Sequence, residues 1–426
     1  MSDLYKLSAL DAAARLLRHE LTAEHYLRGL LERIDAREPT VQAFVIVARE
    51  QALAAARALD AGPIRGPLHG LAVGIKDIFD TYDMPTQGGS DAYAGHQPTI
   101  DAAAVALTRR AGGIIIGKTV TTELATFPAN KTRNPHNPEH TPGGSSSGSA
   151  AAVADGMIPL ATGTQTLGSV IRPASYCGAV AFKPTYNLIP RKGVWNSSDS
   201  NDTVGVFGRS VADVAFYVSA MLHFDKLRVP ANVAAPKIGL CRTYQWDMAT
   251  PAMKAALEQA GRTLAAAGAK VVDLTLPSRF AGLLEAQSIC SRRETGHSYA
   301  DETSRAGDKL NPALYERCLE GYAVPGEDYQ RAQTLVRECR YHLAGAMGDC
   351  DVLLAPAATG EAPKGLGSTG DPVFNQVWTY LHVPLVAVPA GRGPAGLPLG
   401  LQVAGRLDDD ARTLAAAHWI HQRLNS

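Results

Sequence analysis

Apolar residues along this chain follow two patterns, helical spacing in some segments and short continuous runs in others. Leucine and alanine recur at helical spacing over 8–36 and 49–62, which predicts N-terminal helices. Short runs such as "LAVGIKD", "IIIGKTV", "DVLLAP" and "LVAVPA" predict strands separated by helical segments. This alternation is typical of an α/β fold, with a central mixed, twisted sheet covered by helices on both faces. Residues 186–207 and 275–330 show neither pattern and are expected to be loop-like or irregular.

Charge and cysteine content exclude several classes of protein. Lysine plus arginine number 41, as do aspartate plus glutamate, so no basic excess points to nucleic acid or an anionic membrane surface. The six cysteines form no CxxC pair, which argues against a disulfide framework or zinc site and favours buried thiols in a reducing cytosol. We see no signal-peptide pattern and no apolar run near the ~18 residues of a membrane span, so a cytoplasmic protein is expected.

Three short motifs match the sequence patterns of known sites, but the segments within or around them do not have the secondary structure that those sites require. "GGIIIGKT" at 112–119 matches a P-loop, yet its isoleucines predict a strand where a phosphate-binding turn is needed. "GSSSG" at 144–148 matches a nucleophile elbow, yet the polar, proline-containing segment before it cannot be the required apolar strand. His136 and His140 stand four residues apart, but Pro138 between them forbids a regular helical interior, so no metal site is expected.

Two further elements have both a structural and a chemical interpretation. Lys76 ends a predicted buried strand, where it could bond to Asp77 or a carbonyl group. Burial would also disfavour its charged form, lower its pKa and make it a base. The run "GGSSSGS" at 143–149 holds only glycine and serine, which by composition alone is typical of a flexible linker.

The third element is "GTQTLGSVIRP" at 163–173, where small residues turn the chain directly after a predicted strand. Ser169 follows Gly168 on this turn. Consecutive backbone N–H groups at 166–169 could point at one spot, an arrangement suited to a developing oxyanion. A serine that caps a helix on a tight turn explains the same residues equally well.

Taken in this order, the lysine, the Gly/Ser run and the serine on the glycine turn resemble the amidase signature family. The resemblance extends over residues 8–422 and rests on "GLAVGIKDIFD", "GGIIIGKTVTTELA", "TRNPHNPEHTPGGSSSGSAAAVA", "GTQTLGSVIRPASYCGAVAFKPT" and "LPLGLQVAG". It implies one large domain over 1–426, made of N-terminal helices (8–62), a catalytic core (63–225) and a C-terminal substrate-shaping part (226–426).

The family's catalytic triad is Ser–cis-Ser–Lys, which the resemblance carries onto Ser169, Ser145 and Lys76. Ser169 would be the nucleophile, and Ser145, on a cis bond after Gly144, would relay its proton to neutral Lys76 and return it to the leaving amine. On this interpretation the Gly/Ser run is a constrained catalytic loop. The oxyanion hole is expected to comprise the backbone N–H groups of Thr166, Leu167, Gly168 and Ser169. The neighbouring hydroxyls are expected to be structural, bonding backbone groups or the lysine; they belong to Ser146 and Ser147.

Three positions depart from the common family pattern. Gln165 stands where many members have aspartate, and Leu167 where many have glycine or alanine, so its side chain must project away or narrow the pocket. Arg172 follows the nucleophile by three residues instead of two. This "SVIRP" spacing resembles malonamidase-like bacterial members, in which the arginine can hold a substrate carboxylate; the alternative is an arginine that braces its own loop.

The resemblance implies an amidase that hydrolyses a small carboxamide through a serine acyl-enzyme, releasing ammonia or an amine without a metal or organic cofactor. The substrate could carry a carboxylate, or be a ureide or aryl amide. A second function is the ammonia-releasing subunit of a tRNA-dependent amidotransferase, although the chain is short for that role and its neutral charge gives no tRNA-facing signal. An inactive scaffold is disfavoured because all three triad positions are intact. The expected partner is a small-molecule amide, and the expected assembly is a homodimer.

Overall fold

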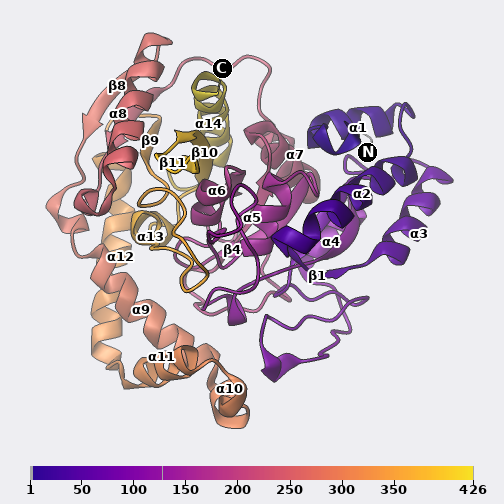
Figure 1. Ribbon diagram of the computed structural model, residues 1–426. Helices are drawn as coiled ribbons and strands as arrows, with labels where there is room; N and C mark the ends of the chain where they lie inside the picture. The colour runs from indigo at the N-terminus through magenta and orange to yellow at the C-terminus, as the bar shows by residue number, and fades with distance from the viewer. Residues whose placement is uncertain (1–2, 127, 426) are drawn as a thin grey trace.

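The computed structural model describes residues 3–126 and 128–425. Within these residues eleven strands form one sheet, in the order β1-β3-β2-β4-β6-β5-β10-β11-β9-β7-β8 (Figure 1). The strands are β1 (Phe44–Val47), β2 (Ala72–Lys76), β3 (Ile114–Thr119), β4 (Leu160–Gln165), β5 (Val180–Lys183), β6 (Thr203–Gly208), β7 (Lys237–Cys241), β8 (Lys270–Leu274), β9 (Val352–Pro356), β10 (Leu385–Arg392) and β11 (Pro398–Ala404).

The α-helices of the described residues are α1 (Ala9–Leu17), α2 (Ala23–Val41), α3 (Arg49–Asp60), α4 (Ala103–Arg110), α5 (Ser147–Ala154), α6 (Ile171–Cys177), α7 (Val211–Leu222), α8 (Pro251–Ala266), α9 (Leu283–Ser298), α10 (Ala300–Arg305), α11 (Pro312–Ala323), α12 (Gly326–Ala346), α13 (Val373–Tyr380) and α14 (Asp410–Leu424). Ser8 and Thr22 cap the first two helices through their side-chain oxygens. Because these caps satisfy N–H groups that have no partner within the helix, the N-terminal helices begin where the apolar spacing begins.

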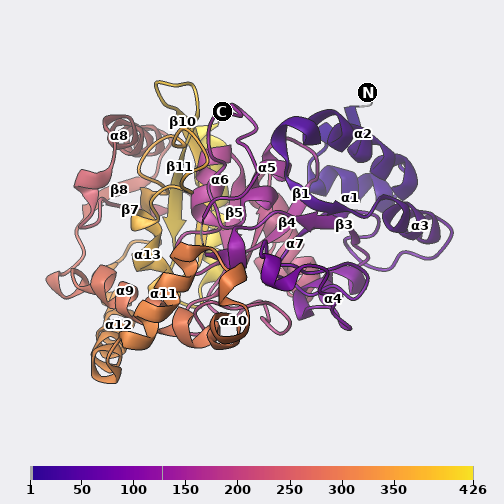
Figure 2. The same ribbon diagram turned by 60° about the horizontal axis from the view of Figure 1, so that its bottom comes forward.

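The sheet is mixed and covered by helices on both faces, as predicted. Strand β2 is parallel to β3 and β4, and β7 is parallel to β8 and β9, whereas the other neighbouring strands are antiparallel. Helices α5 and α6 pack together over the middle strands (Figure 2), and α7, α14 and α8 pack against one another or against the sheet on its other side. Strands from both ends of the chain join one sheet, so the fold has a single continuous core.

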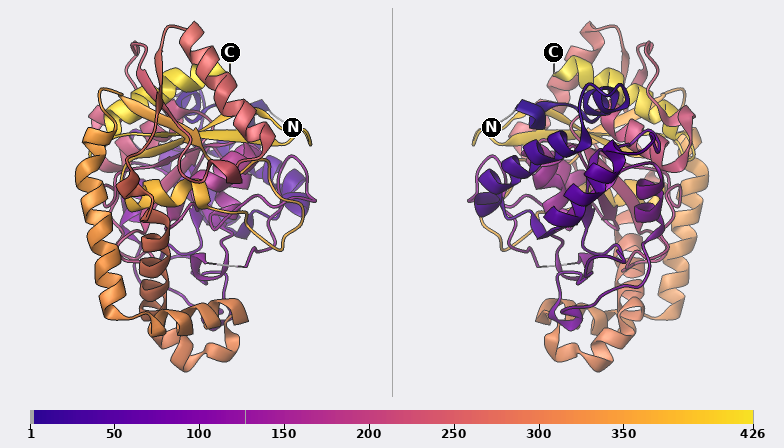
Figure 3. Two further views of the ribbon diagram at one scale, coloured as in Figure 1. Left: turned by 90° about the vertical axis from the view of Figure 1, so that its left-hand side faces the viewer. Right: turned by 90° about the vertical axis from the view of Figure 1, so that its right-hand side faces the viewer.

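One strand was not predicted, and two predictions about local structure are wrong. Strand β1 lies among the expected N-terminal helices, and central strand β6 begins inside the segment 186–207, for which the sequence predicts a loop. The segment 275–330, predicted to be irregular, is mainly helical. Together α9, α10, α11 and α12, residues 283–346, form a helical projection that extends from the sheet, and we call it the arm (Figures 1 and 3).

Two expectations from composition agree with the structure. All six cysteines are unpaired and buried, as scattered core thiols should be. Within the described residues, no helix combines the length and the apolar character that crossing a membrane requires.

Candidate active site

Lys76 ends strand β2 and is fully enclosed, with 0% of its surface exposed. Its Nζ donates hydrogen bonds to Oγ of Ser145 and to Oγ1 of Thr164, each at 2.8 Å. Burial lowers the pKa of Lys76 to about 7, and the negative charge of Asp202 opposes that shift. With this pKa, the side chain of Lys76 is an uncharged amine in a large fraction of the molecules near neutral pH. In both forms it contacts the hydroxyl of Ser145.

The Gly/Ser run at 143–149 is a packed loop and not a flexible linker. All seven residues are buried, and the peptide bond between Gly144 and Ser145 is cis, as predicted. Gly148 has no room for a side chain, because a Cβ there would overlap the carbonyl oxygen of Ala43. The small residues thus allow this loop to approach the neighbouring backbone closely.

Ser146 and Ser147 bond to backbone groups, as predicted. Oγ of Ser146 donates to the carbonyl oxygen of Thr164 and accepts from its N–H, both at 3.3 Å. Oγ of Ser147 donates to the carbonyl oxygen of Val120 at 3.3 Å. These contacts tie the loop to β4 and to the end of β3, so the position of Ser145 is set by the sheet.

Gln165 holds the turn that carries Ser169. Its Oε1 accepts from the N–H groups of Val170 and Ile171 at 2.9 Å each, and its Nε2 donates to Oγ1 of Thr379 at 2.8 Å. A carboxylate could accept the first two bonds but could not donate the third. The glutamine therefore replaces the family's common aspartate while adding a tie to α13.

The four N–H groups expected to form the oxyanion hole have no hydrogen-bond acceptor among the described residues. Gly168 packs so closely on Asn375 that a Cβ would overlap the Asn375 side chain. Leu167 lines the cavity described below, so it narrows the pocket instead of projecting away. A turn with unpartnered donors next to a serine is suited to stabilising negative charge on an oxygen.

Ser169 is 8% exposed and lines the same cavity. Its carbonyl oxygen accepts from the N–H of Ser146 at 3.4 Å, which brings the turn against the catalytic loop. The predicted relay has one contact in place, between Lys76 and Ser145. The other, between Oγ of Ser145 and Oγ of Ser169, is not among the hydrogen bonds of the described residues.

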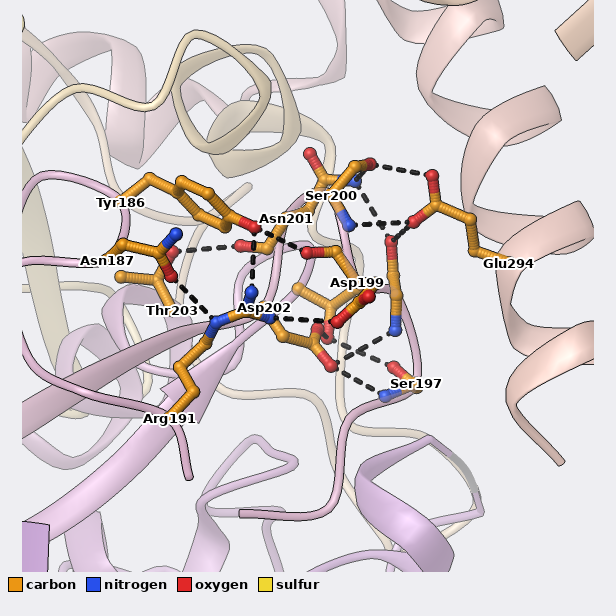
Figure 4. A network of polar contacts seen from close by, with 12 residues as sticks. Tyr186, Asn187, Arg191, Ser197, Asp199, Ser200, Asn201, Asp202, Thr203 and Glu294 are labelled. Atoms are coloured by element: carbon orange, nitrogen blue, oxygen red, sulfur yellow. Dashed lines mark hydrogen bonds and ion pairs between the residues drawn. The ribbon is translucent and has the colours of Figure 1, made fainter. Parts of the chain in front are cut away.

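Asp202 is a buried carboxylate beside the turn that the sequence analysis did not identify. It accepts from the N–H groups of Ser197 at 2.6 Å and Ser198 at 3.1 Å, and from the hydroxyl of Thr166 (Figure 4). Burial raises the pKa of Asp202, and the hydrogen bonds from Thr166 and the backbone oppose this shift. Asp202 thereby holds Thr166, the first residue of the expected oxyanion hole, against the loop that carries Ser197 and Ser198.

Glu294 of α9 ties the arm to the same loop. Its carboxylate accepts from the hydroxyls of Ser198 at 2.6 Å and Ser200 at 2.7 Å (Figure 4), and from the hydroxyl of Tyr329 at 2.8 Å. The arm is therefore attached to the candidate site through polar contacts, and its helices contribute to the pocket.

Arg172 is 4% exposed. The sequence left two roles open for it, holding a substrate carboxylate and bracing its own loop, and its contacts have features of both. Its Nη2 donates to the carbonyl oxygen of Gly144 at 2.8 Å and to Oγ1 of Thr369 at 3.0 Å, so it braces the catalytic loop. Its Nε and Nη1 are buried and have no hydrogen-bond partner among the residues that the structure describes. Burial lowers the pKa of Arg172. Unsatisfied guanidinium donors are costly to bury, and a ligand with acceptor oxygens would satisfy them.

A cavity of about 350 Å³ joins these groups. One wall is the turn and the start of α6, with Ser169 and Arg172, and a second is the segment around 367–372. A third belongs to the arm and includes Ser291, Thr295 and Arg317. Its volume is at the small end of the range for ligand pockets, which suits a small molecule.

Two of the three short motif matches, the P-loop match and the histidine pair, have structural roles. Lys118 of the P-loop match lies in β3 and pairs with Asp77 at 3.1 Å, so of the two interpretations of Lys76 the structure does not have the one in which it bonds to Asp77. His136 and His140 bond to carbonyl oxygens at 2.8 Å each. Within the residues that the structure describes, no cluster of histidine, cysteine or carboxylates could hold a metal ion.

Sequence reasoning missed several residues of this site. Thr164 had a readable signal, because Thr162 and Thr164 alternate with small residues in a buried strand and so put polar groups on one face. Asp202 lies in the polar run "NSSDSNDT", which by itself is typical of a surface loop. Arg317 carried no sequence signal, since its position depends on how the arm packs.

Comparisons with known proteins agree with this geometry. The chain matches the family model described as Amidase over residues 25–414. It is 33% identical over 477 aligned positions to a glutamyl-tRNA(Gln) amidotransferase subunit from Geobacter metallireducens, covering 99% of this chain and 98% of that protein. Solved structures similar to it include an amidase (TM-score 0.91, 29% identity, 98% of this chain and 100% of that one) and the peptide amidase of Stenotrophomonas maltophilia (TM-score 0.82, 28% identity, 99% and 97%).

The sheet, the packed serine loop and the buried lysine define an α/β enzyme that acts on amide C–N bonds. Because the family model covers most of the chain, the chain belongs to the amidase family and is an amidase-signature hydrolase, as the resemblance implied.

Proposed function

We propose that this chain hydrolyses a small carboxamide through an acyl-enzyme on Ser169. The observation that carries the proposal is the 2.8 Å hydrogen bond between Nζ of Lys76 and Oγ of Ser145, next to a turn whose Ser169 lines the cavity. A serine hydroxyl is a weak nucleophile until a base takes its proton. A lysine with a pKa of about 7 can accept that proton at neutral pH.

The reaction would begin when Oγ of Ser169 attacks the amide carbon. Its proton passes to Oγ of Ser145, whose own proton moves to Nζ of Lys76. The oxyanion of the tetrahedral intermediate accepts from the N–H groups of the turn at 166–169. The lysine then returns a proton through Ser145 to the leaving nitrogen, the C–N bond breaks, and water releases the acyl group by the same steps.

The contact between Ser145 and Ser169 is expected to form when substrate is bound. Catalytic hydrogen bonds are often long or misaligned without substrate and tighten in the Michaelis complex. Apart from the substrate and one water molecule, the proposed steps use only side chains and backbone groups of this chain.

The substrate is proposed to carry a carboxylate near the scissile amide. Support comes from Arg172, whose Nε and Nη1 are buried without partners in the described part of the chain while its Nη2 braces the loop. A guanidinium binds a carboxylate bidentately and fixes its orientation. The malonamidase-like interpretation of "SVIRP" predicts the same substrate class, and ureides and aryl amides are the competing classes.

The test is a panel of small amides with released ammonia as the readout, run on the parent and on Ser169→Ala. The panel contains malonamate-like acids, neutral amides of equal size, a ureide and an aryl amide. Loss of the nucleophile should lower kcat/KM by about 10³-fold or more, because triad members act as a unit. Ser368→Ala is the matched control, since this serine also lines the cavity. A Ser169→Ala variant with a tenth of the parent rate would show that Ser169 is not the nucleophile.

A second function, the ammonia-releasing subunit of a tRNA-dependent amidotransferase, is supported by the names of the curated relatives. The 477 aligned positions exceed the 426 residues of this chain, so the Geobacter relative has segments that this chain lacks. This difference favours the independent amidase. Ammonia release by the purified chain alone distinguishes the two, because the second function would require partner subunits for full activity.

A homodimer and a cytoplasmic location also remain proposals. Six buried, unpaired cysteines fit a compartment in which thiols stay reduced. Light scattering after size-exclusion chromatography would measure the assembly directly.

A further inference from the structure

The arm also contacts the candidate site through a buried carboxylate that lies behind the cavity wall. Glu294 of α9 is 8% exposed, and its side chain points from the arm toward the loop at 197–202 (Figure 4). The same helix lines the cavity with Ser291 and Thr295, whereas Glu294 is not among the lining residues. Any effect of Glu294 on catalysis must therefore pass through other residues.

The carboxylate of Glu294 is hydrogen-bonded at both oxygens. Oε2 accepts from the hydroxyl of Ser198 at 2.6 Å and from the N–H of Ser200 at 3.1 Å. Oε1 accepts from the hydroxyls of Ser200 at 2.7 Å and Tyr329 at 2.8 Å. A carboxylate has about four acceptor sites, so these donors satisfy it. Because most of them come from the loop, the carboxylate holds that loop in one conformation.

Asn201 fixes the direction of the two serine hydroxyl bonds. Its side chain is buried, and its Nδ2 donates to Oγ of Ser198 at 3.0 Å and to Oγ of Ser200 at 2.8 Å. An amide nitrogen only donates, so each serine hydroxyl accepts from Asn201 and donates to Glu294. Buried networks whose members are all satisfied are rigid. The loop therefore presents its next residue to the site in a defined position.

That next residue is Asp202, which lies opposite the turn of the expected oxyanion hole. Strands β4 and β6 are antiparallel, and their pairing ends at Gln165 and Thr203. Thr166 and Asp202 continue this register by one residue, so they face each other just beyond the ladder. The hydroxyl of Thr166 donates to the Asp202 carboxylate. The χ1 angle of threonine is restricted, so holding the hydroxyl also limits how the backbone of Thr166 can turn.

Ser198 connects the two carboxylates. Its hydroxyl donates to Glu294, and its N–H donates to Asp202 at 3.1 Å. A continuous series of direct hydrogen bonds between buried groups thus runs from the arm through Ser198 and Asp202 to Thr166.

We propose that Glu294 is a positioning residue for the oxyanion hole, acting through Ser198 and Asp202 on the backbone N–H of Thr166. An oxyanion donor is effective when it is aimed at the oxygen before the reaction, because no reorganisation is then needed in the transition state. The arm is on this view part of the catalytic unit in addition to being a wall of the cavity. The inference rests on the proposed function in taking the turn at 166–169 as the oxyanion hole.

The first test separates kcat from KM. Removal of one oxyanion donor typically costs about 10²–10³-fold in kcat, and a misdirected donor should cost less, so Glu294→Ala should lower kcat by about 10–100-fold. KM should change by less than about twofold, because the lost interaction belongs to the transition state. Ser198→Ala should give a similar loss, and the double variant little more, because both residues act in one series. Glu294→Gln keeps the length and one acceptor oxygen, so its kcat should lie between those of Glu294→Ala and the parent.

Tyr329→Phe is the matched control, since it removes one hydroxyl donor from the same carboxylate and leaves the contacts with the loop. Its kcat should stay close to that of the parent, and melting curves establish that each variant is folded. The proposal is overturned if Glu294→Ala keeps the kcat of the parent, or if Tyr329→Phe gives the same loss. A loss confined to KM would also overturn it.

The second test observes the turn without turnover. Backbone amide NMR spectra give the resonances of Thr166, Leu167 and Gly168 in the parent and in each variant. Glu294→Ala and Ser198→Ala should shift or broaden these resonances, whereas Tyr329→Phe should leave them in place. Shifted turn resonances together with a parent that hydrolyses no amide would support the positioning role and contradict the proposed function. Unchanged turn resonances in both alanine variants would overturn the positioning role and leave an active parent as an amidase.

Discussion

Lys76 and Lys118 are both 0% exposed and lie on neighbouring parallel strands, yet their amines have different partners. Nζ of Lys118 lies 3.1 Å from a carboxylate oxygen of Asp77 and also donates to carbonyl and hydroxyl oxygens around it. Nζ of Lys76 donates to the hydroxyls of Ser145 and Thr164. One lysine is a member of an ion pair, and the other is enclosed by hydroxyl groups.

This difference separates a structural lysine from a candidate base. Burial lowers the pKa of both lysines, and for Lys118 the Asp77 carboxylate opposes the shift through direct contact. Lys183 shows that a lowered pKa alone does not identify a base: burial brings its pKa to about 7 as well, yet its Nζ donates to the carbonyl oxygen of Pro184. The contact with a serine hydroxyl is what sets Lys76 apart.

The largest effect is expected from Lys76→Met. If the neutral amine is the base, the parent's kcat/KM should rise about tenfold per pH unit below pH 7 and level off above it, because protonation removes the acceptor. The variant should lose about 10³-fold or more at pH 8 and show a flattened profile. Initial rates of ammonia release between pH 5 and 9 provide the measurement. A variant whose pH profile matched that of the parent would show that another group is the base.

Lys118→Met should instead act on stability. Removing one partner of a buried ion pair leaves Asp77 uncompensated, which typically costs about 3–5 kcal/mol of unfolding free energy. Urea denaturation monitors the loss, and the folded fraction should keep its activity. Adding Asp77→Asn should recover part of the loss because it removes the stranded charge. An equally stable Lys118→Met variant with no activity would remove the distinction between the two lysines.

Helices and strands were predictable from the sequence where burial of apolar side chains alone determines the segment. Fully apolar strands such as Val352–Pro356 are readily recognised, because burial on both faces leaves no polar positions. Helix α9 is not, because its buried face includes Gln287, Ser291, Glu294 and Thr295. Two of these polar residues, Ser291 and Glu294, hydrogen-bond to Arg317 and Ser198. Because polar side chains occupy the buried face, the apolar spacing that predicts a helix is interrupted.

The residues of the candidate site also divide into those that the sequence indicates and those that it does not. The lysine, the Gly/Ser loop and the serine turn are visible as local stretches, but each alone also has a structural interpretation. Their assignment to one site came from the resemblance of the three stretches, in this order, to the amidase signature family. Asp202 and Arg317 act through partners distant in sequence, namely Thr166 and Ser291. Their roles depend on tertiary packing, which a local pattern does not encode.

The smallest effect on kcat/KM is expected from Thr164→Val. This variant makes the surroundings of the Lys76 amine less polar and so sharpens the comparison with Lys118. Oγ1 of Thr164 accepts from Nζ of Lys76 at 2.8 Å. Without this acceptor the ammonium form loses more than the neutral amine, so the inflection of the pH profile should move to lower pH. A net hydrogen bond is worth about 0.5–1.5 kcal/mol, so kcat/KM should fall by less than about tenfold.

Thr162→Val is the matched control on the same strand. Oγ1 of Thr162 accepts from the backbone N–H of Lys76 at 3.1 Å and not from its amine. This variant should therefore lose a similar amount of stability while its pH inflection stays with that of the parent. Equal shifts in the two variants would mean that the strand, and not the contact with the amine, controls the titration. A shift confined to Thr164→Val would show that the hydroxyl groups around Nζ tune the lysine directly, as the contrast with Lys118 requires.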